Sequence, residues 1–414
     1  MSNGDSEETQ TDVLLDRQRP KPTGGLVVIF REAAETAAQI AALEAGGLRA
    51  SALPIVADLT DFMAAEREVC AVLTELGVAF VPECAPARAG ELIGLLSDQE
   101  AVADTRPEFY LFATAPFQDT PERTWGVAAV GAVESPFTGQ GIRLAVLDSG
   151  LDLQHPDYRE RRVASRSFVP EEDVDDLQGH GTHCAGTAAG RPLDSGTPRY
   201  GVAPQAELYV GKVLNNRGAG RERDILAGMA WAVGEGCQVI SMSLGAPVRQ
   251  GETYNTLYER EAQAALSAGS LIVAAAGNES ARSNGYIAPV GMPANSPSIL
   301  AVAAVDQALE VAEFSSGGIN AGIDGGGAVD LAAPGVGVFS ALPLPREYGS
   351  LRGTSMACPH VAGCAALWAE SDPALRGRAL WDSLTQSALP LSADERDLGK
   401  GLVQAPGRGG PAAA

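Results

Sequence analysis

A doubly wound α/β fold with a mostly parallel sheet is predicted for the larger, C-terminal part of the chain. Continuous apolar runs, rich in β-branched residues or alanine, stand at 144–147, 208–214, 239–244, 271–276 and 299–305. Helical stretches at 221–233 and 259–267 alternate with these runs. Runs that are apolar on both faces suit strands covered by helices on both sides, and the alternation of strand and helix favours parallel pairing.

A smaller α+β unit is predicted before this region, at 24–112. Strands are expected at 25–30, 78–81 and 101–103, and helices at 32–45, 59–76 and 87–96. The acidic segment 1–23 and the segment 406–414 are expected to be disordered tails. A linker at 113–123, rich in Pro and Thr, leads into the larger domain at 124–405.

The composition excludes several classes of partner. The chain has 414 residues, 45% of them hydrophobic, and a net charge of −22 from 52 acidic and 30 basic residues. Such a charge repels nucleic acid and anionic membranes, and no apolar run reaches the length of a membrane span. The polar N-terminus lacks a signal-peptide pattern, so a cytoplasmic location is expected, with secretion as the alternative. We also expect a monomer.

The six cysteines, at 70, 84, 184, 237, 358 and 364, form no CxxC pair and no zinc-like cluster with histidine. We expect no dense disulfide framework.

Three segments place a reactive side chain at the boundary of an element. The first is Leu-Ala-Val-Leu-Asp-Ser-Gly, in which an apolar strand ends at Asp148. A carboxylate at the end of a central strand is half buried and needs a partner. A turn or capping role for Asp148 is the alternative from this segment alone.

The second segment is Gly-His-Gly-Thr-His-Cys-Ala-Gly, at 179–186. Glycines flank His180, and the segment continues into a helix of small residues. Two of the four histidines of the chain stand here, and His183 is interpreted as a packing residue.

The third segment is Gly-Thr-Ser-Met-Ala-Cys-Pro-His-Val-Ala-Gly, at 353–363. Ser355 begins an apolar helix, where a serine is ordinarily a cap. The free N–H groups and the dipole of a helix N-terminus also favour developing negative charge. His360, inside this helix, is interpreted as a packing residue.

Together these segments resemble the subtilisin family of serine proteases, in the family's Asp, His, Ser order. A fourth match is Ala-Ala-Ala-Gly-Asn-Glu at 274–279, and the resemblance spans about 124–405. It implies a serine endopeptidase in which Ser355 is the nucleophile, His180 the general base and Asp148 the residue that orients His180. It further implies that the side-chain amide of Asn278 completes the oxyanion hole.

The resemblance also implies that substrate lies extended between two backbone edges. The residues of these edges are Gly218, Ala219 and Gly220 on one side and Ser243, Leu244 and Gly245 on the other. The primary pocket is expected between 243–246 and 274–277, with small uncharged walls that suit a large apolar or aromatic residue. Glu222 stands where relatives often have an aromatic residue, which leaves the extended specificity open.

No cofactor is expected for the chemistry, and structural calcium stays an open alternative. The loop 191–200 has only Asp194 as an acid, and the acidic run 171–176 is interpreted as a solvated charge run rather than a calcium site. Cys184, one helical turn after His180, has a counterpart in the proteinase K-like relatives.

The unit at 24–112 resembles the family's ferredoxin-like inhibitory propeptide in its place and α+β order. This implies a zymogen that cuts itself and keeps its N-terminal unit as an intramolecular inhibitor. A docking domain is the alternative for this unit. A processing protease dedicated to one cellular substrate, or an inactive peptide-binding scaffold, are the alternatives for the whole chain.

Overall fold

The computed structural model describes residues 22–32, 34–54, 59–109, 117–192 and 196–407. The chain divides into two compact units, one ending at Ala113 and the other beginning at Thr114. The predicted tails lie outside the described residues, except that β1 already begins at Pro22 and that Pro406 accepts a hydrogen bond from Ser135 Oγ.

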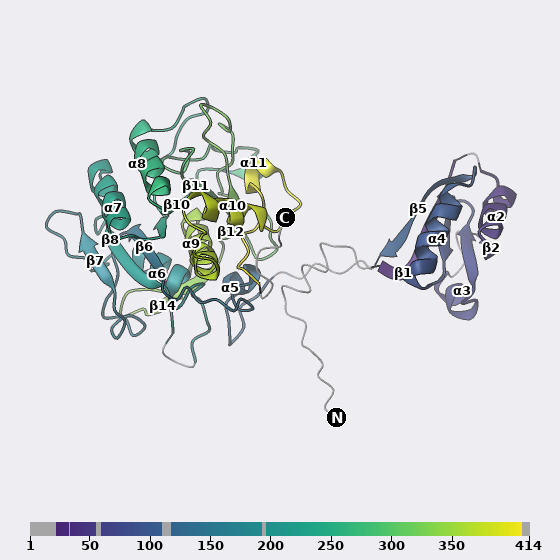
Figure 1. Cartoon of the computed structure of the whole chain (residues 1–414), viewed down its shortest axis with the longest axis horizontal. Helices are drawn as coiled ribbons and strands as arrows, with labels where there is room; N and C mark the ends of the chain where they lie inside the picture. Colours follow the sequence, from purple (N-terminus) through teal and green to yellow (C-terminus); the bar gives the residue numbers. More distant parts are fainter. Residues whose placement is uncertain (1–21, 33, 55–58, 110–116, 193–195, 408–414) are drawn as a thin grey trace. The chain divides into compact units, whose positions relative to one another are not determined.

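In the residues that the structure describes, the N-terminal unit has a five-stranded sheet together with helices (Figure 1). Its elements are β1 (Pro22–Phe30), α2 (Thr36–Ala45), β2 (Arg49–Leu53), α3 (Leu59–Ala65), β3 (Val69–Leu73), β4 (Val78–Val81), α4 (Pro86–Ser97) and β5 (Val102–Phe109). The strand order is β2-β3-β4-β1-β5, with β1 antiparallel to β4 and β5. Strands β5-β1-β4-β3 follow the ferredoxin-like order, and β2 adds a parallel edge strand.

The predicted helix 59–76 is wrong in its second half. Helix α3 ends at Ala65, and the run Val-Cys-Ala-Val-Leu forms β3 instead. Four of these five residues are buried, which a central strand achieves and an amphipathic surface helix does not. The prediction also missed β2, and it ended β5 six residues too early.

The C-terminal unit contains a seven-stranded sheet in the order β12-β11-β10-β9-β6-β8-β7. Every neighbouring pair is parallel. The strands are β6 (Arg143–Asp148), β7 (Ala164–Ser167), β8 (Glu207–Lys212), β9 (Val239–Met242), β10 (Leu271–Ala275), β11 (Leu300–Val305) and β12 (Leu331–Pro334). The five predicted strands are all present, and β7 and β12 extend the sheet at its two edges.

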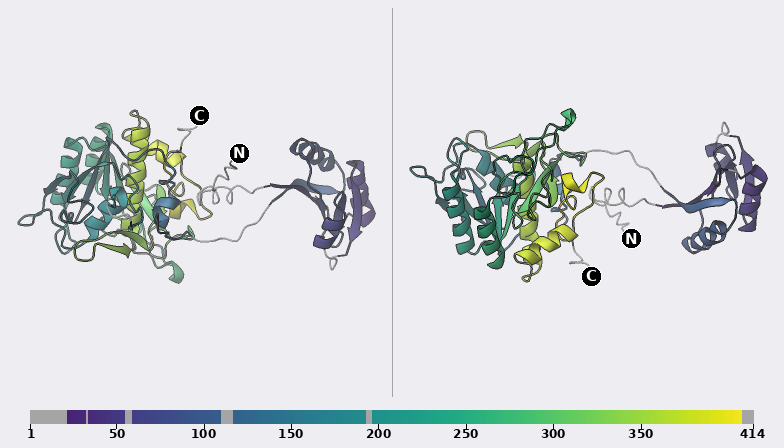
Figure 2. Two further views of the ribbon diagram at one scale, coloured as in Figure 1. Left: turned by 90° about the horizontal axis from the view of Figure 1, so that it is seen from below. Right: turned by 90° about the horizontal axis from the view of Figure 1, so that it is seen from above.

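Helices cover both faces of this sheet (Figures 1 and 2). Helices α7 (Glu222–Gly234) and α8 (Thr256–Ser267) pack against each other and against β6, β8 and β10. Helices α6 (His180–Ala189) and α9 (Thr354–Ser371) pack against each other and against β6 and β9–β12. Short helices α5 (Trp125–Ala129), α10 (Arg378–Gln386) and α11 (Glu395–Leu398), the turn η1 (Arg282–Asn284) and the hairpin β13 (Val338–Ala341)–β14 (Tyr348–Leu351) complete the unit.

Residues 117–123 were predicted as linker, but they are part of the C-terminal unit. Phe117 is 2% exposed, and its N–H donates to Gln307 O at 2.7 Å. Asp119 Oδ1 accepts from Trp125 N–H at 2.7 Å and so fixes the start of α5. The apolar side chain of Phe117 and the cap from Asp119 tie this segment down despite its Pro and Thr content.

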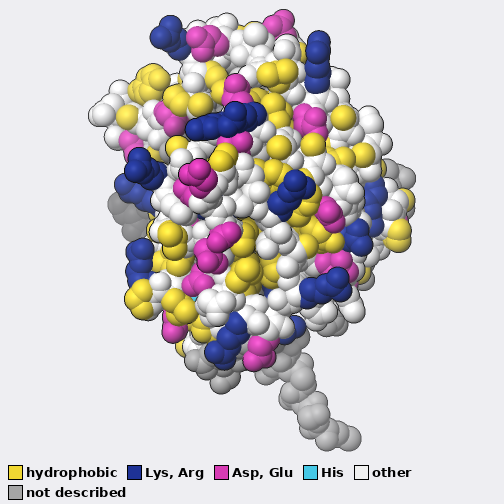
Figure 3. All heavy atoms as spheres, turned by 90° about the vertical axis from the view of Figure 1, so that its left-hand side faces the viewer, with side chains coloured by type: hydrophobic (Ala, Val, Ile, Leu, Met, Phe, Trp, Pro, Cys, Tyr) yellow, Lys and Arg dark blue, Asp and Glu magenta, His cyan; other side chains and the backbone are white. Residues whose placement is uncertain are grey.

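The surface of the C-terminal unit carries charges of both signs. On the face in Figure 3, acidic and basic side chains are interspersed among apolar ones rather than gathered into one patch. Among the described residues, no helix has the length and apolar character needed to cross a bilayer.

Helix α9 lies so close to α6 and to Val202, which follows α6 along the chain, that a glycine is required at the point of contact. A Cβ built on Gly363 would lie 2.5 Å from Val202 Cβ and 3.0 Å from Ala188 O. A Cβ built on Gly234, near the end of α7, has nothing within 4 Å.

The substitution Gly363→Ala should therefore destabilise the C-terminal unit by about 1–3 kcal/mol through overpacking. Gly234→Ala, the matched control, should stabilise it by roughly 0.5–1 kcal/mol because alanine is the better helix former. Urea unfolding followed by circular dichroism measures both. Equal effects of the two substitutions would contradict the close approach of the helices.

Candidate active site

Asp148 and His180 form the most direct contact of the site. Asp148 is the last residue of β6, and His180 is the first residue of α6. His180 Nδ1 lies 2.8 Å from Asp148 Oδ1 and 3.0 Å from Oδ2. The Asp148 side chain is 0% exposed and that of His180 is 24% exposed, so the carboxylate is sealed off while the imidazole reaches the surface.

A second carboxylate, Asp176, holds this pair in place. Its Oδ2 accepts from Thr182 N–H at 2.8 Å and from the Thr182 hydroxyl at 2.7 Å. Its Oδ1 accepts from Gly179 N–H at 2.8 Å and from the Ser149 hydroxyl at 2.9 Å. Asp176 thus caps α6, which begins with His180. It also accepts a hydrogen bond from Ser149, the residue after Asp148.

Ser355 lies in the first turn of α9, and hydrogen bonds to its backbone carbonyl hold it in place. Its carbonyl accepts from Ser243 Oγ at 2.8 Å and from Cys184 Sγ at 3.4 Å. Its own hydroxyl donates to Ser243 O at 3.4 Å. Cys184 Sγ lies 3.8 Å from His180 Nδ1, so one side chain contacts both His180 and the Ser355 backbone.

Asn278 lines the same cavity as His180 and Ser355, and its side-chain amide has a fixed orientation. Its Oδ1 accepts from Thr354 N–H at 2.8 Å and from the Thr354 hydroxyl at 3.1 Å. The carbonyl oxygen is therefore occupied, and Nδ2 is left as the donor. A cavity of about 370 Å³ is lined by His180, Asn278 and Ser355 together.

The electrostatics of His180 follow from this geometry. Burial by itself lowers the pKa of His180, but the adjacent Asp148 carboxylate outweighs it, so the pKa of His180 lies well above 6.5. Burial raises the pKa of the Cys184 thiol, which therefore stays neutral beside the imidazole. The Asp148 carboxylate thus favours the charged form of the His180 ring, the form that arises when the ring takes up a proton.

A comparison of the sequence with known families decides where this arrangement belongs. A model of the subtilase family (peptidase S8) matches residues 139–407. The chain belongs to the subtilase family. Its relatives, the subtilisins, are serine endopeptidases that need no cofactor for catalysis. This subtilase is therefore a subtilisin-like serine endopeptidase.

Curated relatives align over most of the C-terminal unit. Subtilisin from Bacillus pumilus is 41% identical over 269 residues, which are 64% of this chain and 90% of the relative. Subtilisin Savinase from Lederbergia lenta is 40% identical over 285 residues, which are 68% of this chain and 96% of the relative.

Solved structures agree in fold. Sphericase is 32% identical with a TM-score of 0.58, over 68% of this chain and 97% of that one. A cold-adapted subtilisin-like serine proteinase is 30% identical with a TM-score of 0.53, over 65% of this chain and 89% of that one.

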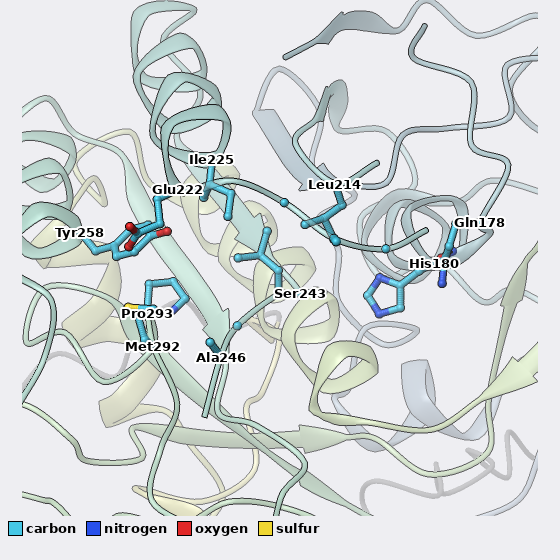
Figure 4. A pocket seen from close by; sticks show the side chains of 15 residues that line it. Gln178, His180, Leu214, Glu222, Ile225, Ser243, Ala246, Tyr258, Met292 and Pro293 are labelled. Atoms are coloured by element: carbon cyan, nitrogen blue, oxygen red, sulfur yellow. The ribbon is translucent and has the colours of Figure 1, made fainter. Parts of the chain in front are cut away.

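The subtilase has a second hollow beside His180, with a volume of about 440 Å³ (Figure 4). All six residues predicted to form the substrate edges line it: Gly218, Ala219, Gly220, Ser243, Leu244 and Gly245. His180 and Gln178 lie at one end in Figure 4, and Glu222 and Tyr258 at the other. Residues 274–277, expected as a pocket wall, do not line this hollow, and Met292 and Pro293 do.

The remaining two histidines of the segments are packing residues, as predicted. His183 is buried, its Nε2 lies 3.0 Å from Val338 O, and burial lowers its pKa to about 3. His360 is buried, its Nδ1 lies 2.8 Å from Met356 O, and burial lowers its pKa to about 4.

The acidic run 171–176 was interpreted from the sequence as a solvated charge run, but two of its carboxylates have structural roles. Asp176 is 2% exposed and caps α6. Glu172 Oε2 accepts from Asn216 N–H at 2.9 Å and lies 3.4 Å from Nζ of the buried Lys212. Asp194, in the loop considered for calcium, lies outside the described residues.

The structure offers one group of three ligating side chains, among the residues that it describes. Its members are Asp148, His180 and Cys184, whose ligand atoms all lie within 4.8 Å of one another. These atoms are already engaged with each other and with Ser355, so the group is explained by the site itself.

The titration of His180 provides a direct test of its environment. In wild-type protein its pKa, followed by NMR of the imidazole, should lie above 6.5. In the Asp148→Asn variant it should fall below 6.5, because the carboxylate that favours the charged ring is gone and burial remains. His183, with a pKa of about 3, is the internal control and should stay uncharged in both proteins. An unchanged pKa of His180 would contradict the ion pair.

Proposed function

We propose that this subtilase hydrolyses peptide bonds through an acyl-enzyme on Ser355. The observation that carries the proposal is the contact of His180 Nδ1 with Asp148, at 2.8 Å, in the wall of a cavity that also exposes Ser355 and Asn278. Base, orienting carboxylate, nucleophile and amide donor then surround one reacting carbonyl.

In this mechanism Ser355 Oγ attacks the carbonyl carbon while His180 Nε2 takes the hydroxyl proton. Asp148 holds the other ring nitrogen and stabilises the imidazolium that forms. The carbonyl oxygen becomes an oxyanion, which the Asn278 amide and the Ser355 N–H stabilise. His180 then gives its proton to the leaving amine, and water releases the acyl group by the same steps in reverse order.

The residues before the scissile bond are proposed to be apolar or aromatic. Leu214, Ile225, Met292 and Pro293 give the hollow beside His180 an apolar lining, and the small residues of the two edges permit strand-like pairing with substrate. Apolar side chains of the substrate gain from leaving water here, by about 25 cal/mol per Å² buried.

We also propose that the chain is a zymogen and that its N-terminal unit acts as an intramolecular inhibitor. Two observations support this: the unit is compact by itself, and its ferredoxin-like strand order is the one expected for such a propeptide. A monomeric state and a cytoplasmic location belong to the same proposal, and structural calcium remains an alternative within it.

The Asn278→Ala variant tests the oxyanion hole. Its kcat should fall by about 10²–10³-fold, as for the loss of one such donor in a subtilisin, with little change in KM. The donor acts on charge that exists only in the transition state. Asn284→Ala, on the exposed turn η1, is the matched control and should keep wild-type kcat. A loss carried by KM alone would show that Asn278 only positions substrate.

Self-cleavage is the test of the zymogen. The cut should fall within about 110–124, and the anchoring of 117–125 on the C-terminal unit favours 110–116. Wild-type chain should yield a new N-terminus there, while the Ser355→Ala chain stays whole. Intact mass and N-terminal sequencing after expression give the answer. A wild-type chain that is fully active while uncut would make the N-terminal unit a docking domain.

A further inference from the structure

The charges of the cleft change sign at the catalytic centre. Two hollows meet at His180 and Gln178, which line both of them. The hollow with the substrate edges has one acidic lining residue, Glu222, whose Oε1 accepts from Asn255 Nδ2 at 2.9 Å. The hollow on the Ser355 side has two basic lining residues, Arg346 and Arg352, and no carboxylate.

The two arginines stand on firmly held backbone. Arg352 precedes Gly353, whose N–H donates to Gly335 O at 2.8 Å at the start of α9. Arg346 lies in the connection between β13 and β14, where Leu344 N–H donates to Asp152 Oδ2 at 2.9 Å and Leu342 N–H to Glu347 O at 2.6 Å. The positions of both Cα atoms relative to Ser355 are thereby fixed.

Both guanidinium groups are exposed and free to bind. Neither has a hydrogen-bond or ion-pair partner in the part of the chain that the structure describes. Glu347, their acidic neighbour in the hairpin, does not line the hollow. Two unpaired cations beside Ser355 are unexpected in a chain with 52 acidic and 30 basic residues.

The direction of the substrate decides what meets these arginines. Residues before the scissile bond occupy the hollow with the two edges, as proposed above. The chain beyond the bond then leaves past His180, which protonates the amine, into the hollow lined by Arg346 and Arg352. An extended chain advances about 3.3 Å per residue, so the first three residues after the bond come within reach of an arginine side chain.

We propose that Arg346 and Arg352 select substrates with acidic residues within three positions after the scissile bond. This inference rests on the proposed function and adds a substrate class to it. A carboxylate there pairs with a planar guanidinium, which offers several donors in one fork. The same carboxylate before the bond meets Glu222 and gains nothing, so the selection depends on the side of the bond.

Quenched fluorescent peptides test the proposal in enzyme that was expressed as the full chain and has undergone self-cleavage. The peptides share an apolar residue before the bond and differ only by Glu or Gln at each of the next three positions. The measured quantity is the ratio of kcat/KM for the Glu and Gln peptides. At low salt this ratio should reach about threefold to tenfold at one or more positions, and it should shrink at high salt because exposed charges are screened.

Variants separate the arginines from general effects of charge. In the Arg346→Gln/Arg352→Gln double variant the ratio should fall to about one, and in the Arg346→Lys/Arg352→Lys double variant it should be partly restored. Arg260→Gln changes an exposed arginine of α8 outside both hollows and should keep the wild-type ratio. Because each ratio is taken within one protein, loss of folded enzyme does not alter it.

A wild-type ratio of one at all three positions would overturn the inference and leave the proposed function intact. The same holds if the double variant keeps the wild-type ratio. Failure to cleave any peptide would instead contradict the proposed function, and the inference with it.

Discussion

The buried carboxylate of Asp176 is the constraint on which the arrangement of the site depends. It joins Ser149, the residue after Asp148, to the first turn of α6, which begins with His180. A buried charge is stable only when its hydrogen-bonding capacity is filled. Three backbone N–H groups and two hydroxyls donate to Asp176. The charge that caps the helix therefore also sets the separation between Asp148 and His180.

The parallel sheet supplies the rest of the geometry. Asp148 ends β6, the edge residues from Ser243 follow β9, and Asn278 follows β10, so all three meet at the carboxyl edge of one sheet. Ser355 reaches the same edge from α9, which packs beneath β9–β12. Thr354, next to Ser355, orients Asn278, so the proposed nucleophile and the proposed amide donor are aligned by adjacent residues of one helix.

Much of this was predictable, because the signals were local. The five apolar runs, and the motifs around Asp148, His180 and Ser355, each lie within one element and its boundary. Asp176 was missed because nothing in an acidic run marks which carboxylate is buried, and that depends on where α6 begins. Strand β3 was missed because a short apolar run fits a helix equally well until its partner strands are known. The two arginines gave no signal, since only the fold brings the β13–β14 hairpin beside α9.

The order of the elements along the chain also determines at which stage of synthesis and folding the site becomes complete. Asp148 lies on the first strand of the large sheet, while Ser355 begins a helix that follows the last one. Contacts between such distant segments form late, because long loops must close first. A chain that ends before residue 355 lacks Ser355, the proposed nucleophile, altogether. The site therefore cannot form until the whole sheet has assembled.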